Sequence, residues 1–128
     1  MSWYQTEIVV FADGALENIE KYSGAYKGES FDRGFIKSRY VIGGIGRIPA
    51  AWHEYLEKYV KMDYGSDLYV CGKKELQKMI RLNNITEVYD ELWDDFDKDG
   101  KVVTHKHKIP IGDILDRGVY GILEIEIF

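Results

Sequence analysis

The stretch FIKSRYVIGGIGRIP, residues 35–49, joins the most strand-like run of the chain to its most helix-like run. Its first half alternates in period two, so the two basic side chains in it project from one face of a predicted strand. The glycines that follow leave bare backbone beside an arginine, which suits a phosphate or carboxylate. The sequence therefore predicts an anion-binding turn formed by Lys37, Arg39, Gly43, Gly44, Gly46 and Arg47. The alternative is a purely architectural bend that packs a helix close to the sheet.

Apolar spacing predicts the elements on either side of this turn. Residues 3–11 read as a central strand, and a short helix is expected between Asp13 and Gly24, followed by a long glycine-rich loop over 23–34. After Pro49 the apolar residues recur at spacings of three, four, seven and eight, which is typical of an amphipathic helix reaching Val60.

The second half of the chain contains a segment whose pattern fits two different elements. A short strand at 68–71 carries Cys71 as a buried thiol, and a helix with Leu76, Met79 and Ile80 inward follows it. Residues 86–96 fit the helical period and are predicted as a helix. The competing interpretation makes them the first arm of a hairpin across the turn sequence DKDG, residues 97–100.

Two more strands complete the predicted fold. We expect a strand over 101–109, a short helix over 111–116, and a closing strand over 119–128 whose face with Glu124 and Glu126 is solvated. This order predicts an α+β fold with a mostly antiparallel or mixed sheet of about five strands and helices packed on one face. A ferredoxin-like core with additions belongs to this class.

Length and composition bound the class of protein. A chain of 128 residues is expected to form a single globular domain, residues 1–128, and its ordinary hydrophobic content excludes intrinsic disorder. No apolar run is long enough to span a membrane, and the N-terminus lacks the pattern of a signal peptide, so we expect a cytoplasmic protein.

Charge is segregated along the chain. The net charge is −5, and residues 87–99 alone contribute −6. Such segregation favours oriented association with a charged partner over nucleic-acid binding. Asp94 and Asp95 are therefore predicted to contact a basic protein surface, with Tyr26, Phe31 and Arg33 of the long loop as further contact residues.

Two motifs offer metal chemistry. Residues 95–102 resemble the first eight positions of an EF-hand loop, with Asp95, Asp97 and Asp99 as candidate calcium ligands, but Lys106 stands where the bidentate Glu belongs. A solvated turn is the plainer interpretation, and no cofactor other than calcium is expected. His105 and His107 form an H-x-H pair on a strand, which could serve a metal-dependent hydrolase if a third ligand converged on it.

These residues favour a non-enzymatic binding protein that acts through a protein–protein interface, as an inhibitor or accessory factor. One alternative is a binder of a nucleotide or another phosphorylated ligand at the turn 43–47. The other is a metal-dependent hydrolase that uses His105 and His107.

Overall fold

The computed structural model describes residues 3–14, 36–56, 58–61, 67–115 and 119–127. In this part of the chain, seven strands form one antiparallel sheet in the order β3-β4-β7-β1-β2-β5-β6. The strands are β1 (Trp3–Phe11), β2 (Ile36–Ile42), β3 (Lys58–Lys61), β4 (Asp67–Cys71), β5 (Glu87–Phe96), β6 (Val102–Pro110) and β7 (Tyr120–Ile127). The α-helix α2 (Lys73–Leu82) and the 3-10 helices η2 (Ala50–Tyr55) and η3 (Ile111–Asp113) accompany them.

The predicted fold class is therefore wrong. The described chain is nearly all β, with seven strands and one α-helix instead of an α+β fold with about five strands. Two segments that were predicted to be helical are responsible, because residues 86–96 and the end of 49–60 are strands. The ferredoxin-like arrangement fails with them.

Residues 86–96 form the first arm of a hairpin, so the preferred helix is wrong and the competing interpretation holds. The apolar residues of this segment recur at every fourth position, a spacing that fits one face of a helix and one face of a regular strand alike, so periodicity does not distinguish the two. The turn decides between the two structures. Gly100 has φ of 79°, and the Asp97 carboxylate accepts the amides of Asp99 at 2.8 Å and Lys101 at 2.9 Å.

The predicted helix from Pro49 to Val60 is also wrong. It is replaced by η2, which ends at Tyr55, and by β3, in which Tyr59 and Val60 pair with residues of β4. The helical turn ends where Leu56 adopts an extended backbone, with φ of −101° and ψ of 116°. Trp52 anchors the turn in the core. Its side chain is fully buried, and its indole N–H donates to the Asn83 side chain at 2.7 Å.

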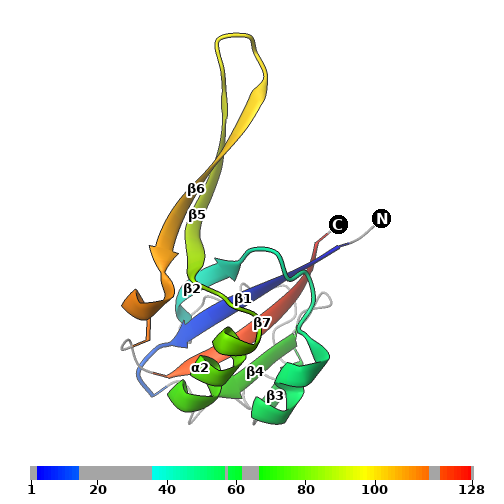
Figure 1. Ribbon diagram of the computed structural model, residues 1–128, viewed down its shortest axis with the longest axis vertical. Helices are drawn as coiled ribbons and strands as arrows, with labels where there is room; N and C mark the ends of the chain where they lie inside the picture. The colour runs from blue at the N-terminus through cyan, green and yellow to red at the C-terminus, as the bar shows by residue number, and fades with distance from the viewer. Residues whose placement is uncertain (1–2, 15–35, 57, 62–66, 116–118, 128) are drawn as a thin grey trace.

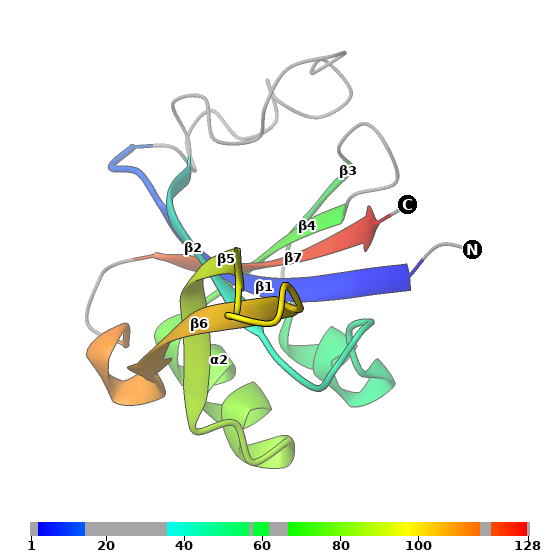
Figure 2. The same cartoon turned by 90° about the horizontal axis from the view of Figure 1, so that it is seen from above.

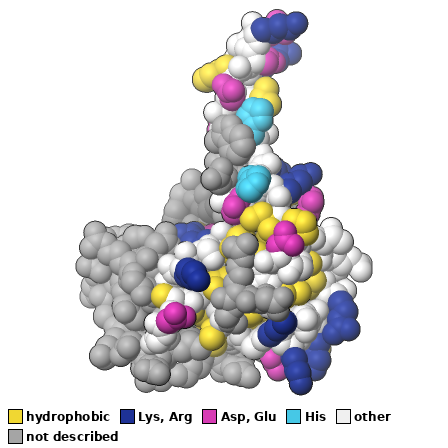
Figure 3. All heavy atoms as spheres, turned by 90° about the vertical axis from the view of Figure 1, so that its left-hand side faces the viewer, with side chains coloured by type: hydrophobic (Ala, Val, Ile, Leu, Met, Phe, Trp, Pro, Cys, Tyr) yellow, Lys and Arg dark blue, Asp and Glu magenta, His cyan; other side chains and the backbone are white. Residues whose placement is uncertain are grey.

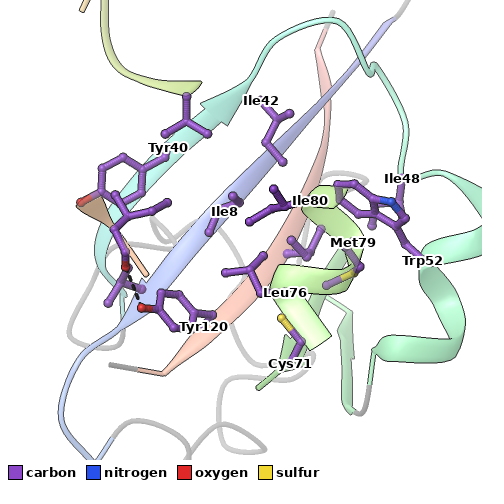
Figure 4. Packing of buried hydrophobic residues seen from close by; sticks show 14 residues of the cluster. Ile8, Tyr40, Ile42, Ile48, Trp52, Cys71, Leu76, Met79, Ile80 and Tyr120 are labelled. Carbon is purple, nitrogen blue, oxygen red and sulfur yellow. Dashed lines mark hydrogen bonds between the residues drawn. The ribbon is translucent and has the colours of Figure 1, made fainter. Parts of the chain in front are cut away.

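The core lies between the sheet and the layer formed by α2, η2 and η3, which occupy one side of the sheet (Figure 2). Figure 4 shows Leu76, Met79 and Ile80 of α2 facing Ile8 and Ile42 of the sheet, so the prediction for this helix is confirmed. The Tyr120 hydroxyl donates to the Ile114 carbonyl at 2.6 Å at the edge of this cluster. Cys71 is buried in β4, as predicted.

The face of β7 that was predicted to be solvated is part of this core. Ile122 is completely buried, and Glu124 beside it is only 7% exposed. The carboxylate tolerates burial because it accepts the Ile48 amide at 2.8 Å and pairs with Arg47 at 3.3 Å. The centre of the opposite face of the sheet is covered as well, with Val9 and Leu123 completely buried. β1 is thus central and buried on both faces, as its sequence predicted.

Candidate functional site

The hairpin of β5 and β6 projects beyond the rest of the molecule and forms its longest dimension (Figure 1). We call this hairpin the arm. Its two strands pair from Glu87 opposite Pro110 to Phe96 opposite Val102. The attachment to the sheet is narrow, because β5 pairs with β2 at a single position, Tyr89 opposite Val41. Past this position, β6 is the only described strand that pairs with β5.

A narrow attachment has an energetic consequence. A two-stranded ribbon without a third strand or a packed layer is marginally stable in water. The arm therefore depends on its own turn and cross-strand contacts. One such contact is the bond from the Thr104 hydroxyl to the Asp94 carboxylate, at 2.8 Å.

The strand register assigns the side chains of the arm to two faces. We call the first face the tip-to-base face. In register, it carries Phe96 opposite Val102, Asp94 opposite Thr104, Leu92 opposite Lys106, and Tyr89 opposite Lys108. Phe96 is 71% exposed and Val102 is 62% exposed. The other face carries Asp95 opposite Val103, and both of its histidines. Hydrophobic side chains are visible near the end of the arm in Figure 3.

A pocket of about 330 Å³ lies where the tip-to-base face meets the body. We call it the crook pocket. Three aromatic residues contribute to its lining, Trp3 and Tyr4 of β1 and Tyr89 of β5. The Lys106 ammonium also lines it, 4.9 Å from the centre of the Tyr89 ring, and Trp3 is 58% exposed. A pocket of this size is near the lower end for small-ligand sites, roughly 300–1,000 Å³.

The glycine turn forms another wall of the crook pocket, through Gly43, Gly44 and Gly46. Gly43 is required by close packing, because a Cβ there would lie 2.8 Å from the Tyr89 ring. Gly44 has φ of 87°, which favours glycine. The Gly46 carbonyl accepts the Thr6 hydroxyl at 2.8 Å. Each glycine of the turn thus has a structural role beside its place in the pocket.

Arg47 is held by the protein itself. Its guanidinium pairs with Glu124 at 3.3 Å and lies 4.2 Å from the centre of the Tyr4 ring. The hydrogen bond to Glu124 and the attraction of that carboxylate raise the pKa of Arg47. The nearby carboxylate offsets the charge that Arg47 would offer to an anion.

Lys37 and Arg39 do not converge with Arg47. Arg39 binds the buried carboxylate of Glu7 with two nitrogens, at 3.0 and 2.8 Å. In register, Arg39 lies beside Val9 and Glu124 lies beside Thr6, so the two ion pairs occupy opposite faces of the sheet. Lys37 is exposed on the strand that carries Arg39. Of the residues predicted to form the anion site, the structure brings together only the three glycines and Arg47.

Two of the three aspartate carboxylates in the acidic loop, those of Asp95 and Asp97, accept backbone amides of the hairpin. Asp97 closes the turn through the two amides described above, and the Asp95 carboxylate accepts the Phe96 amide at 2.8 Å. Asp99 contributes its backbone amide to Asp97. Within the described ranges, no group of three or more potential ligands lies together. The calcium hypothesis keeps only its sequence pattern as support.

The histidines lie on the face of the arm opposite the tip-to-base face. His107 contacts the Asp90 carboxylate through Nδ1, and His105 stands opposite Trp93 in register. Figure 3 shows histidine side chains (cyan) along the outside of the arm. Among the residues that the structure describes, no third ligand joins this pair.

Three predicted contact residues, Tyr26, Phe31 and Arg33, lie outside the described residues. Asp94 and Asp95 are both exposed on the arm, on opposite faces. Sequence reasoning missed Phe96, Val102 and Lys106 as site residues. The signal was present, because the hairpin interpretation places Phe96 and Val102 on either side of the turn as an exposed cross-strand pair.

The sequence matches no protein-family model, and no curated protein or solved structure is significantly similar to it. The arm and the crook pocket must therefore be interpreted from their own chemistry. In the part of the chain that the structure describes, no helix has the length and hydropathy needed to cross a membrane.

Proposed function

We propose that this protein is a non-enzymatic binding protein that docks on a protein partner through the arm and the crook pocket, as an inhibitor or accessory factor. The observation that carries this proposal is the exposed apolar pair at the end of the arm, Phe96 and Val102, on the face that leads to the crook pocket.

Burial explains why such a pair supports binding. The end of the arm makes little use of these side chains in folding, since they remain 71% and 62% exposed. Covering them with a partner removes apolar surface from water, which is the main favourable term in most protein association. A partner that packs on the arm also supports a ribbon that has no other layer.

Charge supplies the second argument. The tip is acidic, with Asp94, Asp95, Asp97 and Asp99 around Phe96 and with Lys98 among them. A basic surface on the partner would be steered toward such a tip, which raises the association rate more than the final affinity. Asp94 shares a face with Phe96, so reversing Asp94 to Lys is expected to slow association more than reversing Asp95.

The test is affinity capture from the native lysate with the full chain as bait, combined with analysis of co-purifying small molecules. Phe96→Asp places a charge on the tip-to-base face, and Val103→Asp places the same charge on the opposite face. We expect the wild type and Val103→Asp to retain the same proteins and Phe96→Asp to lose them. Equal retention by Phe96→Asp would contradict the proposed function.

A second candidate function is the binding of a nucleotide or another phosphorylated ligand in the crook pocket. It is favoured by aromatic rings for stacking beside the Lys106 ammonium and the glycine backbone. A nucleotide is expected to raise the melting temperature of the wild type and of Lys108→Gln, but not of Lys106→Gln. An equal rise in all three proteins would contradict this candidate.

A further inference from the structure

The tip-to-base face has an order of side chains that is complementary to itself. From the tip inward, its successive rows hold an apolar pair, an acidic residue, a basic residue and an aromatic ring. In register they are Phe96 opposite Val102, Asp94 opposite Thr104, Leu92 opposite Lys106, and Tyr89 opposite Lys108. Reversing this order puts the aromatic row where the apolar tip was, and it puts the basic residue where the acidic residue was. A surface of this kind matches a second copy related by a twofold axis.

The spacing allows both exchanges at once. Asp94 and Phe96 are two positions apart along β5, and Lys106 and Lys108 are two positions apart along β6. Both steps therefore cover about 6.8 Å along the strands. A twofold axis between the rows of Asp94 and Lys106 places Asp94 of each copy against Lys106 of the other, which gives two identical pairs.

The same axis carries the tip of each arm to the crook pocket of the other. The pocket offers the rings of Trp3, Tyr4 and Tyr89 and a volume of about 330 Å³. Phe96 is the most exposed large hydrophobic side chain in the described chain. Aromatic side chains that enter such pockets typically contribute much of the binding energy of an interface.

Lys106 and Asp94 are suited to pair between chains. Lys106 lies over the Tyr89 ring and has no ion pair with any residue that the structure describes. Asp94 receives one bond from the Thr104 hydroxyl, and a carboxylate has further acceptor positions. Both side chains are exposed, so pairing them requires no rearrangement of the core.

We infer that the partner of the arm is a second copy of this chain, bound with the two arms antiparallel, Phe96 in the crook pocket of the other copy and Asp94 against its Lys106. This inference rests on the proposed function and names its partner. The pairing also gives each two-stranded arm the packed layer that it lacks in a single copy.

The test is sedimentation equilibrium of the full chain over a range of concentrations, with charge-reversed variants. Asp94→Lys and Lys106→Asp each place two like-charged pairs in the interface, and each is expected to weaken the dimer about tenfold or more. An equimolar mixture of the two variants forms opposite-charge pairs at both positions. We expect the mixture to dimerise with close to wild-type affinity, while Asp95→Lys, on the opposite face, dimerises normally.

The mixture also separates binding from folding. A variant that failed to fold could not be rescued by mixing, and far-ultraviolet circular dichroism of each variant checks its fold directly. Phe96→Asp is an independent test of the same interface, and we expect this variant to be monomeric. Failure of the mixture to recover the dimer would overturn the inference, as would a dimer unaffected by Phe96→Asp.

A monomeric wild type overturns the second-copy inference, and the lysate capture then decides the fate of the proposed function. If Phe96→Asp still loses captured proteins, another protein is the partner and the proposed function stands. If Phe96→Asp retains them all, the proposed function fails as well.

Discussion

Glu124 offers the sharpest test of how the core is built. Its carboxylate, 7% exposed, accepts the buried amide of Ile48 at 2.8 Å and holds Arg47 at 3.3 Å. Glu124→Met keeps a side chain of similar length but removes both acceptor oxygens, so the Ile48 amide loses its partner. Glu124→Gln keeps one neutral oxygen that can accept the same amide.

The magnitude follows from the hydrogen bond that is lost. A hydrogen bond to a charged group contributes about 1.5–3 kcal/mol, and an unsatisfied buried amide costs about 1–3 kcal/mol. We therefore expect Glu124→Met to lower the free energy of unfolding by about 3 kcal/mol and Glu124→Gln by about 1 kcal/mol. With an unfolding entropy of about 2.1 cal/mol/K per residue, 3 kcal/mol lowers the melting temperature by about 10 °C.

Urea denaturation and thermal unfolding measure both quantities. Glu126→Met is the matched control, because Glu126 lies on the same face of β7 and is half-buried. Its carboxylate forms no hydrogen bond or ion pair with another residue that the structure describes. We expect its effect to stay within about 0.5 kcal/mol. Equal effects of the Glu124→Met and Glu126→Met substitutions would show that the hydrogen bonds of the buried Glu124 carboxylate do not stabilise the fold.

Three further predictions concern the sheet and the arm. Gly121→Ala is expected to destabilise the protein by about 1–3 kcal/mol in urea denaturation, because a Cβ would lie 2.5 Å from the Tyr69 carbonyl oxygen and 2.8 Å from the Phe11 ring. Burial, and secondarily the Asp67 carboxylate, raises the pKa of Tyr69 above its ordinary 10.0. Above about pH 10 the unfolded chain therefore loses the Tyr69 proton more readily than the native state does. The free energy of unfolding should fall more steeply with rising pH in the wild type than in Tyr69→Phe. Replacing residues 93–105 by Asn-Gly should leave the cooperative thermal transition intact but abolish dimerisation in sedimentation equilibrium, and loss of the folded state would contradict the independence of the arm.

The sequence predicted those elements in which local pattern and tertiary packing agree. The spacing of Leu76, Met79 and Ile80 predicted α2, and the apolar run of residues 8–11 predicted a central strand. The segment 86–96 could not be decided by periodicity, because its apolar residues are four apart and four is a multiple of two. Its turn residues were the better guide, since they depend on local backbone geometry alone.

The candidate site was less predictable, because its residues meet only through strand pairing. Asp94 and Asp95 are neighbours in sequence, but a strand sends them to opposite faces. Trp3 and Lys106 are more than a hundred positions apart and line one pocket. Glu124 looked solvated on charge alone, and only the approach of the Ile48 amide explains its burial.

The single pair that attaches the arm to the sheet, Tyr89 opposite Val41, has a consequence for how this sequence can change. The residues of the arm past this pair do not pack in the core, whereas most positions of β1 and β7 are buried on both faces of the sheet. Substitutions at the exposed tip are therefore expected to change the stability of the fold little. We therefore expect that a foreign hairpin sequence can be grafted past Tyr89 without redesigning the rest of the sheet.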